Sequence, residues 1–96
     1  MKKINFSIGS NNDTHEIETD KALAILSAHY EGMSVSEIVG YWKGQQEKTL
    51  LVAVVCDSVD YTKVKRVCAE LNTALNQEMI LVEIVDTNAL FISDRI

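Results

Sequence analysis

Two helix-like segments, each enclosed between strand-like segments, are the feature that most limits how this chain can fold. Ile4, Phe6 and Ile8 alternate with polar residues, which is the period of a strand with one buried face. Apolar residues then recur at helical spacing over residues 22–30 and, more regularly, over residues 64–75. Proline is absent, so the connections must be built from Gly, Asn, Asp and Ser.

Three further strand-like segments complete the predicted order of strands and helices along the chain. Residues 35–42 are rich in β-branched and aromatic side chains, residues 49–56 are almost wholly apolar, and residues 79–85 are apolar except for Glu83. A polar hairpin loop is expected over residues 43–48. The order strand, helix, strand, strand, helix, strand predicts an α+β fold, the ferredoxin-like βαββαβ sandwich. In it, an antiparallel four-stranded sheet carries both helices on one face.

Local residue chemistry sets the expected helix ends. Thr19 is expected to cap the first helix, which should run for roughly three turns and end near Gly32 in a left-handed cap. The second helix should follow the Asp57–Asp60 turn and end near Asn76. Residues 88–96 are left open between a short edge strand and a docking tail.

Length and charge narrow the class of protein. The 96 residues predict one domain spanning residues 1–96. The net charge of −5 argues against binding to long nucleic acid or to an anionic membrane surface. No apolar run approaches the ~18 residues of a membrane span, and no signal peptide follows the first lysines. We therefore expect a cytoplasmic protein.

Two strands have more apolar surface than one subunit can cover. Residues 50–56 and 79–82 are apolar on both sides, whereas two helices cover only one face of the expected sheet. Self-association would bury the second face, so the sequence predicts a homo-oligomer, either a dimer or a larger assembly.

No arrangement of residues typical of catalysis is present. The sequence lacks phosphate-binding glycine loops, zinc-protease and nucleophile-elbow motifs, and its two histidines and two cysteines lack metal-ligand spacing. So short a chain also leaves little room for an elaborate active site. These observations predict a protein that is not an enzyme and has no catalytic residues, metal site or cofactor.

The charge distribution instead indicates a binding site. Residues 43–66 hold five basic and three acidic residues, a net of +2 in an acidic protein, and they follow two aromatic side chains. A ring can stack on a base while lysines meet phosphate. The predicted ligand-binding residues are Tyr41, Trp42, Lys43, Gln45, Gln46 and Lys48, with Asn11 and Asn12 from the polar loop after the first strand.

The spacing Gly40-Tyr41-Trp42-x-Gly44-x-x-Glu47-Lys48-Thr49-Leu50, followed by Leu75-Asn76-Gln77-Glu78, resembles small uncharacterised bacteriophage and mobile-element proteins of ferredoxin-like type. The resemblance covers roughly residues 4–85. It implies a compact fold without catalytic motifs and, for small acidic phage proteins, inhibition of host immunity. Such inhibitors either bind defence enzymes or sequester cyclic nucleotide signals, and a phage-encoded protein would act in the host cytoplasm.

These observations favour a non-enzymatic phage-type protein that sequesters a small anionic ligand, such as a cyclic nucleotide. Trp42 would stack on the base, and Lys43 and Lys48 would neutralise phosphate. The alternative is an acidic inhibitor that docks directly on a host defence protein, using its acidic helices rather than the hairpin lysines.

Overall fold

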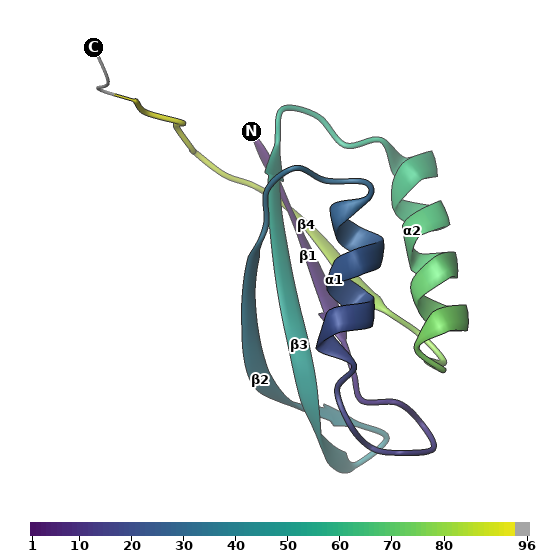
Figure 1. The fold of residues 1–96 in the computed structure, drawn as a ribbon. Coiled ribbons are helices and arrows are strands. Elements are labelled where there is room, and N and C mark those ends of the chain that lie inside the picture. The colour runs from purple at the N-terminus through teal and green to yellow at the C-terminus, as the bar shows by residue number, and fades with distance from the viewer. Residues whose placement is uncertain (94–96) are drawn as a thin grey trace.

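The computed structural model describes residues 1–93, and its elements follow the expected order (Figure 1). Residues 94–96, the end of the segment left open above, lie outside the described residues. The elements are β1 (Lys2–Ile8), α1 (Thr19–Ser27), β2 (Ser34–Trp42), β3 (Gln45–Cys56), α2 (Tyr61–Ala74) and β4 (Leu81–Asp86). None of the helices in the described part of the chain is long and apolar enough to cross a membrane.

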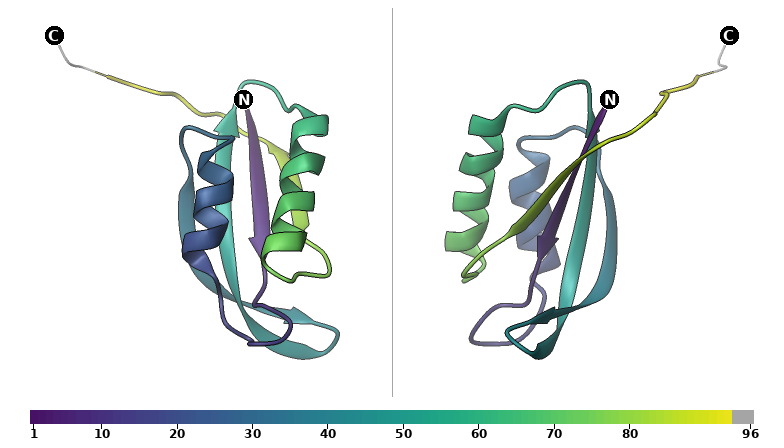
Figure 2. Two further views of the ribbon diagram at one scale, coloured as in Figure 1. Left: turned by 45° about the vertical axis from the view of Figure 1, so that its right-hand side comes forward. Right: turned by 180° about the vertical axis from the view of Figure 1, so that it is seen from behind.

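The four strands form one antiparallel sheet in the order β2-β3-β1-β4. Both helices lie on the same side of this sheet, as the two views of Figure 2 show. Placing β1 at the centre, beside strands from the middle and the end of the chain, gives the ferredoxin-like arrangement. The structure therefore confirms the predicted fold class.

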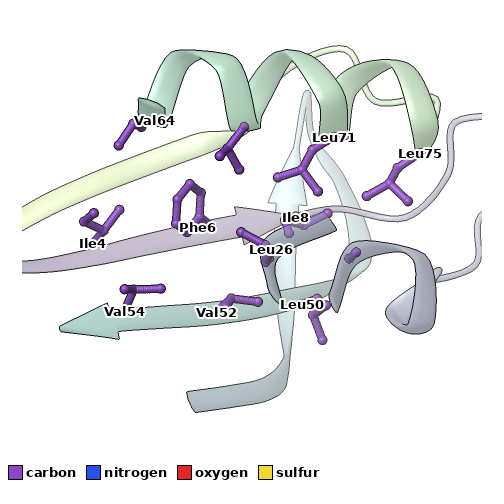
Figure 3. Close-up of a cluster of buried hydrophobic side chains, with 12 residues drawn as sticks. Ile4, Phe6, Ile8, Leu26, Leu50, Val52, Val54, Val64, Leu71 and Leu75 are labelled. Carbon is purple, nitrogen blue, oxygen red and sulfur yellow. The ribbon is translucent and has the colours of Figure 1, made fainter. Parts of the chain in front are cut away.

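The hydrophobic core lies between the helices and one face of the sheet (Figure 3). Alternate strand residues point into it, so every second side chain of β1 and of the middle of β3 is buried. The helices contribute one stripe each, as their spacing predicts. The core residues are Ile4, Phe6, Ile8, Ala22, Leu26, Leu50, Val52, Val54, Val64, Val67, Leu71 and Leu75.

Helix α2 has the expected polar start. The side chain of Asp60 accepts a hydrogen bond from the backbone N–H of Lys63 at 3.1 Å, which satisfies one of the free donors of the first turn. The helix ends at Ala74, close to the predicted end, and Asn76 follows with a left-handed φ of 51°. Asn tolerates this conformation better than most residues.

Helix α1 is shorter than predicted. It ends at Ser27 rather than near Gly32, and Glu18 instead of Thr19 occupies the N-cap position without a side-chain hydrogen bond. Gly32 does not have a positive φ. The backbone N–H of Tyr30 still bonds the Leu26 carbonyl, and the Tyr30 ring packs 6.0 Å from the Phe6 ring. Tyr30 therefore joins the core from a turn, which explains why its spacing looked helical.

The hairpin between β2 and β3 has longer strands and a shorter loop than predicted. Its loop is only Lys43 and Gly44, with φ values of 50° and 78°, and β3 already begins at Gln45. Two successive positive φ angles are the requirement of a type I′ turn, which matches the twist of the flanking strands. The polar residues 45–48 are thus strand residues, extending beyond the helical layer into solvent. Strand β4 starts at Leu81, two residues later than expected.

The chain after β4 has no regular structure over residues 87–93 and extends away from the sheet (Figures 1 and 2). Of the two alternatives left open for this segment, the described residues form a tail.

The two phenylalanines offer a direct test of this core. Phe6 is fully buried between the sheet and the helices, whereas Phe91 in the tail is 82% exposed. We predict that Phe6→Ala lowers the free energy of unfolding by about 3–5 kcal/mol, because it removes a buried ring and leaves a cavity. Phe91→Ala is the matched control and should change it by less than ~0.5 kcal/mol. Urea unfolding measures both, and equal effects would contradict the core assignment.

Candidate ligand-binding groove

A groove of about 630 Å³ lies on the side of the sheet opposite the helices, at the end where the β2–β3 hairpin approaches the α2–β4 connection. Its walls come from segments far apart in the sequence. The lining residues are Ser7, Gly9, Asn12, Ile38, Gly40, Tyr41, Trp42, Glu47, Thr49, Gln77, Glu78, Met79, Ile80, Leu81 and Glu83.

Strand register builds the floor of the groove. Ser7 lies opposite Leu81 and, further along the same pairing, Asn5 lies opposite Glu83. Residues paired across antiparallel strands point to the same side, and alternation places these on the side away from Phe6. The floor is therefore a mixed surface of small polar, apolar and acidic side chains.

Two glycines allow close approach inside the groove. A Cβ atom built on Gly9 would lie 2.6 Å from the Glu47 carboxylate, and one built on Gly40 would lie 2.5 Å from the Thr49 hydroxyl. Any larger residue would displace these side chains. Gly9 thus lets the half-buried Glu47 side chain lie directly over the backbone that follows β1, and Gly40 leaves room for the Thr49 side chain on β3.

A polar clasp connects the hairpin to the α2–β4 connection at the rim. The Trp42 indole N–H donates to Glu78 Oε2 at 3.4 Å, and Lys43 Nζ lies 3.2 Å from Glu78 Oε1. The same ammonium lies 5.8 Å from the centre of the Trp42 ring, which is within cation–π range. The Lys43 hydrogen bond, followed by that from Trp42, lowers the pKa of the Glu78 carboxyl below its ordinary value of 4.5.

The groove has a negative electrostatic character. Among its lining residues are three glutamates and no lysine or arginine. Lys43 offsets the charge of Glu78, but Glu47 and Glu83 form no salt bridge within residues 1–93. Two uncompensated carboxylates beside an aromatic ring attract a cation more readily than an anion.

The structure brings together some of the predicted ligand-binding residues and separates others. Tyr41, Trp42 and Asn12 line the groove. Gln45 is the cross-strand partner of Trp42 and shares its side of the sheet, whereas Gln46 and Lys48 alternate onto the other side. Lys43 stands at the rim, bound to Glu78. The predicted anion-binding role of these residues remains a prediction.

Asn11 has a local role in the loop after β1. Its side-chain oxygen accepts hydrogen bonds from the backbone N–H groups of Asp13 and Thr14, at 2.8 and 3.2 Å, and from the Asn76 amide at 3.2 Å. The Gln77 amide also donates to the Ser10 carbonyl. These contacts hold the loop against the end of α2 and thereby fix the wall that Asn12 and Gln77 form.

The three glutamates were not among the predicted site residues. Glu83 was recognisable as the one charged residue in an otherwise apolar strand, and Glu47 lay inside the spacing that carries the phage-protein resemblance. A lone carboxylate in an apolar strand indicates a position facing solvent or a ligand. The position of Glu83 in the groove depends on strand pairing, which a local sequence pattern does not predict.

Comparison with solved structures finds a phage SAM lyase in its apo state. The match has a TM-score of 0.62 and 18% sequence identity, and covers 88% of this chain and 78% of that chain. No protein-family model and no curated protein sequence matches the chain. At this identity the likeness shows a shared fold.

The prediction that the chain is not an enzyme is contradicted by this likeness. It rested on the missing motifs and on the short length, yet the neighbouring protein, most of whose length is matched by this fold, is a lyase. The motifs sought were those of metal, nucleophile and phosphate-loop chemistry. Lyase chemistry need not use any of them, so their absence had no bearing on this class of enzyme.

The clasp gives a prediction about pH. Because the Glu78 pKa is lowered, the link to Lys43 and Trp42 stabilises the hairpin above pH ~4.5 and is lost as the pH falls through the folded-state pKa. We expect Lys43→Met to raise the Glu78 pKa toward its ordinary value. NMR titration of the Glu78 carboxyl and the Trp42 indole N–H measures this. A Glu78 titration that is unchanged in Lys43→Met would show that the clasp does not form in solution.

Proposed function

We propose that this chain is a phage-type protein that binds S-adenosylmethionine (SAM) in the groove on the open side of the sheet and acts on it as a lyase. The observation that carries the proposal is the pairing of uncompensated Glu47 and Glu83 with Trp42 in one groove. The fold shared with a phage SAM lyase supplies the choice of ligand.

The charge of SAM matches that of the groove. A sulfonium and an ammonium outweigh one carboxylate, so the molecule has a net charge of +1 near neutral pH. Two carboxylates without protein partners would offset this charge, and the net charge of −5 on the chain would draw the ligand toward it. Cations also interact favourably with the face of an indole ring.

The shape and polarity of the groove suit a nucleoside. Its volume of about 630 Å³ falls within the ~300–1,000 Å³ of small-molecule sites. Ile38, Met79 and Leu81 provide apolar surface for an adenine ring, while Asn12 and Gln77 offer hydrogen bonds to its edge or to the ribose. The contact of Trp42 with Glu78 holds the indole at the rim, where it can cover a bound ring.

Lyase chemistry on a sulfonium needs few protein groups. When a carbon–sulfur bond breaks, both of its electrons stay on sulfur, and the sulfonium becomes a neutral thioether. The alkyl fragment then loses a proton to form a double bond or closes a ring onto its own nucleophilic group. Glu47 is placed to accept a proton, because it is half-buried and lies against the backbone at Gly9. Removal of SAM would deny the host its methyl donor, in keeping with an anti-defence role.

Trp42 is the single tryptophan, so its fluorescence reports binding directly. We predict that SAM changes this fluorescence saturably and that S-adenosylhomocysteine, which lacks the positive sulfur, binds about tenfold more weakly, a ratio equivalent to ~1.4 kcal/mol. The double variant Glu47→Gln/Glu83→Gln should lose SAM binding by at least about tenfold. Chromatography of SAM incubated with the protein measures breakdown, which Glu47→Gln should abolish.

Glu31→Gln is the matched control, because it removes the same charge from an exposed residue outside the groove. It should bind and degrade SAM as the unaltered chain does. Binding of cyclic or linear nucleotides without binding of SAM would overturn the proposal in favour of an anion site. A folded protein that binds neither, but captures a stoichiometric host protein, would overturn it in favour of direct docking.

A further inference from the structure

The tail after β4 has an unusual concentration of exposed apolar surface. Leu90, Phe91 and Ile92 are consecutive, and each is more than 80% exposed. Phe91 borders a second hollow of about 610 Å³ near Tyr30 and Cys56, yet its own subunit leaves it almost fully accessible. Three consecutive exposed apolar residues in a soluble chain indicate a contact with another surface.

The sheet has one edge suited to receive such a segment. Within residues 1–93, strand β2 is paired only with β3, so the outer N–H and C=O groups along its nine residues can bond another strand. Its pairing with β3 runs from Ser34 to Trp42 without a bulge, and it contains no proline or lysine. Val35, Ile38 and Val39 are 41%, 40% and 59% exposed. Glu37 is the one charged residue of β2, and proline, lysine and a bulge, which commonly protect an edge strand, are all missing from it.

The opposite edge is protected. Strand β4 has six residues, and it carries Glu83 and Asp86. Asp86 is bound to Lys2 of the neighbouring strand β1. Short length and charge disfavour the addition of a further strand there. The two edges therefore differ, and β2 is the one available for pairing.

We propose that the tail of one copy adds as a strand to the free edge of β2 in a second copy. Residues 88–92 contain no proline, so every N–H of this segment that faces β2 can donate a backbone hydrogen bond to the ladder. Exchanged in both directions, the tails tie two chains together as a dimer. The added strand would lie beside the groove, because residues of β2 line it, and the proposal does not depend on the proposed function.

The area involved approaches that of a stable dimer. Phe91 can bury ~150–250 Å² on each tail, and the receiving surface loses about as much, so two exchanges bury roughly 600–1,000 Å² through Phe91 alone. Leu90 and Ile92, each more than 80% exposed, raise this total toward the area of a stable interface. Stable interfaces bury ~1,200–2,000 Å² in total.

Light scattering after gel filtration of two full-length variants tests the exchange. Leu90→Ser/Phe91→Ser/Ile92→Ser removes the apolar tail, and Val39→Lys places a charge on the β2 edge. Neither alters a core residue, and circular dichroism confirms folding of each. We expect the unaltered chain to be a dimer at 100 µM and both variants to be monomers. The matched control Thr73→Lys, on the exposed side of α2, should remain a dimer.

Mixing the two variants gives the decisive result. The tail variant keeps a free β2 edge and the edge variant keeps an apolar tail, so a mixture can make one of the two exchanges. The mixture should therefore form a one-to-one complex that is weaker than the unaltered dimer, although neither variant associates alone. A monomeric unaltered chain would overturn the proposal and would indicate that the tail folds back on its own subunit. A dimer that survives both sets of substitutions, or a mixture that associates no more strongly than either variant alone, would also overturn it.

Discussion

The pairing of β1 with a strand on each side is the constraint on which the rest of the structure depends. Its register with β3 and β4 sends Ile4, Phe6 and Ile8 into the core. The same register leaves Asn5 and Ser7 on the opposite side, as part of the sheet surface that contains the groove. A slip of one residue would exchange the two sets. Core burial and the geometry of the proposed site are therefore set by one interaction.

This dependence explains how much the sequence could predict. Period-two and helical patterns are local, so they were enough to place the strands and helices and, with the rules of topology, the fold. The predicted ends of helices and strands were wrong where tertiary contacts decide those ends. Tyr30 continues the helical spacing but packs on Phe6 from a turn, and residues 45–48 are polar because the hairpin extends beyond the helices.

The candidate site was predictable only in part, for the same reason. Trp42 and Tyr41 were recognised because they directly precede a segment of net positive charge, where a ring can stack on a base while lysines meet phosphate. Glu78 meets Trp42 across 36 positions of sequence, and Glu83 reaches the groove through pairing with Asn5. The charges counted along the sequence therefore indicated that the net positive segment of residues 43–66 binds an anion. In three dimensions Glu78 binds Lys43, and Glu47 and Glu83 give the adjoining groove the opposite character.

The short length of the chain suggested that there is little room for a functional site, but the structure offers a broad surface for one. Two helices cover one side of the sheet, and neither of them covers the other side (Figure 2). A short chain thus gains a broad surface for a ligand without building a second layer. The cost is a free β2 edge and an apolar tail, and these two features complement each other.

Binding of a cationic nucleoside on the open side of the sheet can be observed by NMR, from backbone and indole shifts recorded during a titration with SAM. We predict saturable shifts confined to the groove, at Gly9, Gly40, Glu83 and the Trp42 indole, with α1 and the outer face of α2 unchanged. Shifts gathered on the helices instead, or no shifts at millimolar SAM in a folded protein, would contradict it.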